Sequence, residues 1–161
     1  MTDRYEPPQG LQRKLILLIS SNAGLGYAPF APGTFGTLAG IPCFYYLSEL
    51  AFPLQLLSLM TIMFLSFWAS EEAGKIYGEA DDGRIVIDEL IGYLVAVAFL
   101  PFSWSTALLG FLWFRLFDII KPPPANWFDQ KMKNGVGVTM DDLVAGVYAL
   151  VALRLCLTIF A

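Results

Sequence analysis

Long apolar runs separated by short polar segments dominate this chain, and their lengths predict helices that lie in a membrane. The apolar runs cover residues 36–52, 54–70, 90–103, 105–119 and 143–161. A helix needs about 20 apolar residues, with a range of about 17–25, to span a bilayer, and the first, second and fifth runs reach that length. The third and fourth runs are shorter and are split by Pro101, so they either extend into flanking residues or form a hairpin that does not cross fully. The pattern predicts an all-α integral membrane helical bundle of about four to five membrane helices.

The chain is expected to form a single domain over residues 1–161, and its first 40 residues predict four further features. Residues 1–10 are expected to form a flexible tail, and residues 11–22 a short interfacial helix with Arg13 and Lys14 near its start. Residues 22–37 are rich in glycine and proline, which is typical of a loop with special backbone geometry. Gly36 and Gly40 form a small-xxx-small pattern that lets helices approach closely. The alternative is that both glycines simply belong to the neighbouring loop.

The overall composition supports a membrane protein. Hydrophobic residues make up 57% of the 161 residues, against about 45–50% in soluble domains. Charged residues make up only 15%, where about 25% is usual. The net charge of −4 argues against a nucleic-acid partner, because phosphate backbones require a basic surface.

The few charged residues predict a topology. If each apolar run crosses once, the N-terminal segment and residues 71–89 and 115–142 lie on one side of the membrane. These segments hold nine of the ten Lys and Arg residues and thirteen of the fourteen acids. The positive-inside rule assigns that side to the cytoplasm. The acidic pairs and the glycine-rich loop are therefore expected to meet at one membrane face.

Two pairs of adjacent acids precede apolar runs and are the main candidates for a metal site. Asp88-Glu89 precedes the third run and Asp141-Asp142 the fifth. A single acid at each position would be explained as a helix cap that interacts with the helix dipole, and residues 139–142 also fit a capping box. Two pairs on one face favour a site, in which one acid of each pair faces inward. The chain contains no histidine, so the donors are hard oxygens, which suit Mg²⁺ or Mn²⁺ better than zinc.

Two other motifs are candidates for phosphate binding. Arg115, Asp118 and Lys121 are spaced to share one helix face, either as a salt-bridged stripe at the membrane surface or as a phosphate-binding group. The turn at residues 32–37 places backbone N–H groups and two threonine hydroxyls at a helix start, as in anion-binding turns. A glycine-rich turn is more often only a turn.

Four motifs together resemble the bacterial phosphatidylglycerophosphatase A family. They occupy residues 32–37, 87–92, 114–124 and 135–146, occur in the family's order, and cover nearly the whole chain from Gly24 onward. The resemblance implies a Mg²⁺-dependent lipid phosphatase of the bacterial cytoplasmic (inner) membrane. Such an enzyme removes the terminal phosphate of phosphatidylglycerol phosphate and leaves phosphatidylglycerol. Other members carry histidines before the Asp-Glu pair, whereas residues 78–83 here contain none, so histidine there is not expected to be essential.

The resulting hypothesis is metal-assisted hydrolysis of a phosphate monoester, with either Asp118 or Asp129 as general base. Direct attack by water and an aspartyl-phosphate intermediate both remain open. The expected metal ligands are Asp88, Glu89, Asp141 and Asp142. The expected phosphate ligands are Gly33, Thr34, Gly36, Thr37, Arg115 and Lys121. The expected catalytic residues are Asp88, Glu89, Arg115, Asp118, Lys121 and Asp129.

The alternative is a small non-catalytic lipid-binding or transport membrane protein. Acids in pumps lie near the middle of the bilayer, whereas here they are confined to the ends of apolar runs. Arg154 is the one charge among the central residues of these runs, and the sequence assigns it no role. The distribution of acids favours the enzyme.

Overall fold

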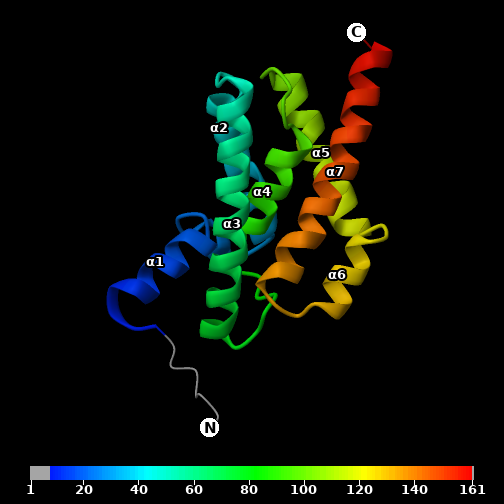
Figure 1. The fold of residues 1–161 in the computed structure, drawn as a ribbon. Helices are drawn as coiled ribbons and strands as arrows, with labels where there is room; N and C mark the ends of the chain where they lie inside the picture. The colour runs from blue at the N-terminus through cyan, green and yellow to red at the C-terminus, as the bar shows by residue number, and fades with distance from the viewer. Residues whose placement is uncertain (1–7, 161) are drawn as a thin grey trace.

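The computed structural model describes residues 8–160, and its regular structure over that range is entirely helical. This confirms that the fold is all-α, as predicted (Figure 1). The expected tail falls mostly on residues 1–7, which lie outside the described residues, and the first helix already includes Gly10. The elements are α1 (Gly10–Ser20), the 3₁₀ helix η1 (Leu25–Tyr27), α2 (Pro32–Ser48), α3 (Phe52–Tyr77), α4 (Ile87–Ala96), α5 (Trp104–Ile120), α6 (Ala125–Lys131) and α7 (Gly135–Phe160).

The short helix α4 lies at the centre of the bundle and packs against α2, α3, α5 and α7 (Figure 1). Its side chains Ile91, Tyr93 and Leu94 are fully buried, together with Phe114 of α5 and Leu153 of α7. A helix that is apolar on nearly every side is typical of a core position. The centre of the fold is therefore the helix that begins with the Asp88-Glu89 pair.

Glycines bring the neighbouring helices into backbone contact with α4. A Cβ atom on Gly92 would lie 2.9 Å from the carbonyl oxygen of Asp142, and a Cβ on Gly146 would clash with the carbonyl oxygen of Gly92. On the other side, a Cβ on Gly36 would lie 2.7 Å from Val86 Cβ, and Gly40 faces Tyr93. The close approach expected from the spacing of Gly36 and Gly40 is confirmed.

Two of the described helices, α3 and α7, are long and apolar enough to cross a membrane. The expectation that the 36–52 run also qualifies is not confirmed, because α2 ends at Ser48, before that run does, and is not one of these two helices. Helix α4 has 10 residues and is about 15 Å long at 1.5 Å per residue, which is about half the thickness of a bilayer core. The structure therefore supports a membrane protein with two candidate spans, and the predicted count of four to five is not confirmed.

The start of α7 differs from the prediction. The capping-box interpretation of residues 139–142 is wrong, because α7 begins at Gly135 and those residues lie inside the helix. Asn134 Oδ1 accepts a hydrogen bond from Gly137 N at 2.9 Å, and Glu71 Oε2 of α3 accepts one from Gly135 N at 2.8 Å. The helix start is therefore fixed by Asn134 and by contact with α3.

Candidate active site

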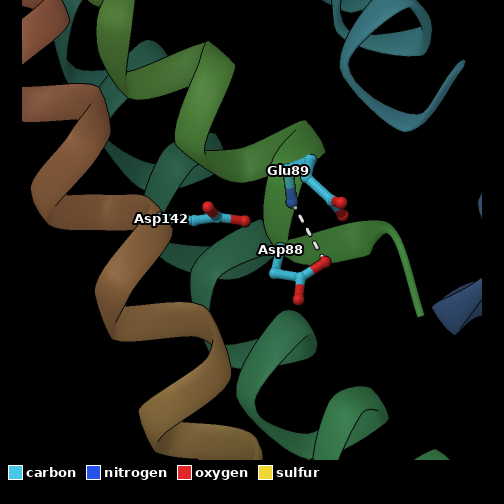
Figure 2. A group of neighbouring side chains, drawn as sticks. All are labelled: Asp88, Glu89 and Asp142. Atoms are coloured by element: carbon cyan, nitrogen blue, oxygen red, sulfur yellow. Dashed lines mark hydrogen bonds between the residues drawn. The ribbon is translucent and has the colours of Figure 1, made fainter. Parts of the chain in front are cut away.

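Three carboxylates from two helices converge beside the start of α4. Asp88 and Glu89 lie in the first turn of α4, and Asp142 reaches toward them from α7 (Figure 2). One oxygen from each side chain can be chosen so that all lie within 4.8 Å of one another. Asp88 is 4% exposed and Asp142 is 5% exposed. The structure thus brings together three of the four predicted metal ligands.

The glycine contacts explain how these carboxylates meet. Gly92 and Gly146 are the glycines at which α4 and α7 touch. Asp88 lies four residues before Gly92, and Asp142 lies four residues before Gly146, so each acid shares a helix face with its glycine. Because α4 and α7 touch backbone to backbone at the glycines, the side chains one turn earlier face each other across a short gap. The site is therefore created by helix packing and not by a loop.

The electrostatics of the cluster favour a bound cation. Burial, with the neighbouring charge of Glu89, raises the pKa of Asp88 well above its ordinary value. Burial also raises the pKa of Glu89 to about 8, against a hydrogen bond with Asp88 that lowers it, and the charges of Asp142 and Asp118 add to the rise. Glu89 Oε2 is buried and has no hydrogen-bond partner among the described residues. Carboxylates forced together in this way are stabilised by a positive ion.

Arg115 and Asp118 of α5 lie beside this cluster. Arg115 Nη1 is 2.6 Å from Asp118 Oδ2, although within the described part of the chain this buried atom makes no well-oriented hydrogen bond. The negative charge of Asp118 contributes to the raised pKa of Glu89. A Cβ on Gly33, in the first turn of α2, would clash with Glu89 Oε1 and lie 3.3 Å from Arg115 Nη1. Gly33 therefore leaves the space in which Glu89, Arg115 and the N-terminus of α2 meet.

Lys121 forms a separate network next to the cluster. Its Nζ lies 2.7 Å from Asp129 Oδ1 of α6 and 2.6 Å from Asp141 Oδ2 of α7. Burial lowers the pKa of Lys121, but the hydrogen bonds with Asp129 and Asp141 and their charges outweigh it, so the pKa is above its ordinary value. Asp141 is therefore engaged by Lys121, while its neighbour Asp142 faces the carboxylate cluster. The expectation that one acid of each pair faces the site agrees with this arrangement at residues 141 and 142. It does not hold for Asp88 and Glu89, because both belong to the cluster.

Two of the predicted phosphate ligands are occupied by internal packing. The hydroxyl of Thr37 is buried and donates a hydrogen bond to the carbonyl oxygen of Gly33 at 2.8 Å. Gly36 is in contact with Val86. Gly33 and Thr34 remain at the first turn of α2, near Arg115.

Sequence reasoning missed the residues that hold the start of α4. Asn22 Nδ2 donates a hydrogen bond to the carbonyl oxygen of Val86 at 2.6 Å, across 64 positions of sequence. The dense glycine and proline content of residues 22–37 indicates a special loop, but nothing in that composition identifies its distant partner. The signal that could have found Asn22 is its place at the start of this loop.

Comparison with known proteins gives a consistent result. The family model described as Phosphatidylglycerophosphatase A matches residues 18–157. The chain is 37% identical over 131 residues to Phosphatidylglycerophosphatase A of Escherichia coli, covering 81% of this chain and 76% of that protein. It is 37% identical over 138 residues to Phosphatidylglycerophosphatase A of Haemophilus influenzae, covering 84% of this chain and 85% of the other.

A third relative has a different printed name. The chain is 34% identical over 146 residues to a Bacteroides thetaiotaomicron protein named "Putative phosphatidylinositol-3-phosphatase", covering 85% of this chain and 90% of that protein. No solved structure matches the chain. All three relatives are thus named as phosphatases of phospholipids.

Proposed function

Because this chain belongs to the phosphatidylglycerophosphatase A family, we propose that it hydrolyses the terminal phosphate monoester of phosphatidylglycerol phosphate. The products are phosphatidylglycerol and inorganic phosphate, and the reaction depends on Mg²⁺. The observation that carries this proposal is the buried group of Asp88, Glu89 and Asp142 with Arg115 beside it. This arrangement offers anionic ligands for a cation and a cation for a phosphate within one site.

The donor set fits Mg²⁺. Asp88, Glu89 and Asp142 would hold the ion through carboxylate oxygens, which are the ligands that Mg²⁺ prefers. The buried and unpartnered Oε2 atom of Glu89 is the kind of orphaned acceptor that a cation satisfies. When bound, the ion supplies charge neutralisation for the phosphoryl oxygens and favours deprotonation of the attacking water.

The remaining roles follow from the positions of the side chains. Arg115 offers its guanidinium Nη1 to a phosphoryl oxygen, and Gly33 and Thr34 add the backbone N–H groups at the N-terminus of α2. Asp118, which pairs with Arg115 beside the carboxylate cluster, is favoured as general base over Asp129, which belongs to the separate Lys121 network. Lys121 then acts by fixing α6 and α7 around the site.

The lipid portion of the substrate would lie along α7. An apolar groove of about 490 Å³ is lined there by Pro124, Met140, Leu143, Val144, Val147, Tyr148 and Val151. Met140 and Leu143 directly flank Asp141 and Asp142 in the sequence, so the groove begins at the same level along α7 as the carboxylates, on the face that points away from α4. An acyl chain in this groove would keep the headgroup at the level of the carboxylates, where it could reach the site without the lipid leaving the bilayer. With the Lys and Arg residues concentrated on the same side as the site, we place the site at the cytoplasmic face of the bacterial inner membrane, in a multi-pass protein.

Phosphate release in detergent micelles tests the proposal. Phosphatidylglycerol phosphate would be compared with phosphatidic acid and phosphatidylinositol 3-phosphate, each with Mg²⁺ and with EDTA. We expect release that requires Mg²⁺ and is fastest with phosphatidylglycerol phosphate. Faster release from phosphatidylinositol 3-phosphate would assign a different substrate to the same site. No release with any substrate would favour a non-catalytic lipid-binding protein.

A further inference from the structure

The loop between α1 and α2 holds the backbone immediately before α4. Val86, two residues before Asp88, is fully buried. Its N–H donates to the carbonyl oxygen of Ser20 at 2.8 Å, and its carbonyl oxygen accepts from Asn22 Nδ2 at 2.6 Å. Both polar backbone groups of Val86 are therefore paired with the last residue of α1 and the loop that follows it.

This loop has an unusual backbone that fits its partner closely. Asn22, Ala23 and Gly24 have φ values of 47°, 57° and 99°, which is a left-handed run that costs energy at the two non-glycine residues. Two residues further on, a Cβ on Gly26 would clash with the carbonyl oxygen of Arg84. Strained backbone persists where the surrounding structure fixes it, and here the fixed partner is the segment that leads into α4.

The start of α4 lacks the usual means of fixing a helix end. Its N-cap residue is Val86, which provides no side-chain capping hydrogen bond. An apolar N-cap is unfavourable compared with Asn, Asp or Ser. The first turn, with Asp88 and Glu89, is therefore positioned from outside by Ser20 and Asn22. Ile16 of α1 packs with Ile85 and Ile87 in one buried cluster and supports the same contact.

We propose that Asn22 is a positioning residue for the metal-binding carboxylates, an inference that rests on the function proposed above. Its amide holds the Val86 carbonyl oxygen, and this contact sets the position of the first turn of α4 relative to Asp142. Residues behind metal ligands typically change metal affinity by about 10–100-fold when they are replaced. Because Asn22 acts through the backbone and not on a ligand directly, we expect an effect near the lower end.

The test uses two substitutions of Asn22 and one control in the full-length protein. Asn22→Gly keeps access to the left-handed conformation and removes the amide, and Asn22→Asp keeps the shape and replaces the donor with a carboxylate. The matched control is Ala23→Gly, in the next left-handed position, whose side chain is exposed. Mn²⁺ binding is measured by the electron paramagnetic resonance signal of free Mn²⁺, and the half-saturating Mg²⁺ concentration is measured from phosphate release. Thermal unfolding without metal reports on folding.

We expect both Asn22 variants to bind Mn²⁺ about 10-fold more weakly and to need correspondingly more Mg²⁺. The KM for lipid at saturating Mg²⁺ should stay near the wild-type value, and Ala23→Gly should bind Mn²⁺ normally. Wild-type Mn²⁺ affinity in either folded Asn22 variant, or an equal loss in Ala23→Gly, overturns the inference alone. If the wild-type protein binds no Mn²⁺, the proposed metal site fails, and the inference fails with it.

Discussion

Replacement of Gly92 by alanine probes how closely the site depends on the contact between α4 and α7. The added Cβ would lie 2.5 Å from Phe114 Cε2 and 2.9 Å from the carbonyl oxygen of Asp142. Ordinary van der Waals contact begins at 3.4 Å. The Asp142 backbone must therefore retreat by about 0.5 Å, and the Phe114 ring by about 0.9 Å. Asp142 is itself one of the clustered carboxylates, so the clash moves a proposed ligand directly.

This displacement is large on the scale that a metal site tolerates. Metal–ligand distances hold within about 0.2 Å, and a misplacement of about 1 Å can cost about 100-fold in rate. We expect Gly92→Ala to lower kcat/KM for phosphatidylglycerol phosphate by about 10- to 100-fold. The assay is Mg²⁺-dependent phosphate release in micelles, combined with thermal unfolding of the same preparation.

A second glycine variant separates the site effect from general overpacking. A Cβ on Gly110 of α5 would lie 2.5 Å from Val97 Cγ1, which is a comparable clash with a side chain away from the carboxylates. Overpacking costs about 1–3 kcal/mol in either place, so both variants should unfold at lower temperature. Gly110→Ala should keep kcat/KM within about threefold of the wild-type value, well short of the loss that a 1 Å misplacement at the site can cause. A folded Gly92→Ala protein with wild-type activity would refute the reasoning.

Lys121, the apolar groove along α7 and Glu89 each allow a separate test. Lys121→Met leaves Asp129 and Asp141 without their cation, and we expect the free energy of unfolding to fall by about 2 kcal/mol, after allowing for partial exposure. Thermal unfolding would show this as a fall in Tm of about 4–8 °C, and an unchanged Tm would contradict the role given to Lys121. Val147→Trp fills the groove along α7 and should raise the KM for long-chain substrate but not for a soluble short-chain analogue; equal effects on both would argue against an acyl chain in the groove. The pKa of Glu89 is raised to about 8 without metal, so protons compete with Mg²⁺ for this carboxylate below that pH. The half-saturating Mg²⁺ concentration should therefore fall as pH rises from about 6 to about 8, and a concentration that does not change with pH would exclude this competition.

The helical class and the main site residues could be predicted from the sequence because both depend on local patterns. Apolar runs indicated helices, and acids at the ends of those runs indicated a site at one end of the bundle. The structure brings Asp88, Glu89 and Asp142 together, as that interpretation requires. The four family motifs assigned the same residues to a phosphatase.

The remaining features depend on tertiary contacts that a single sequence does not reveal. Helix α7 begins at Gly135 because α3 packs against that glycine and Glu71 accepts its N–H, although glycine is a poor helix former. The different environments of Asp141 and Asp142 depend on the rotation of α7 about its axis. The sequence pattern indicated a helix start at residues 139–142, whereas α7 begins at Gly135, so this rotation could not be predicted. The pairing of Asn22 with Val86 joins residues 64 positions apart and leaves no local pattern.

The most direct test of the central claim compares neighbouring acids of α7. Asp142 belongs to the carboxylate cluster, whereas Asp141 is paired with Lys121. We would measure Mn²⁺ binding and Mg²⁺-dependent phosphate release for Asp142→Asn and Asp141→Asn, with Asp88→Asn as a second ligand variant. The account predicts that Asp142→Asn and Asp88→Asn fold but lose both metal binding and turnover, while Asp141→Asn still binds Mn²⁺. Wild-type turnover in the folded Asp88→Asn and Asp142→Asn proteins would contradict it.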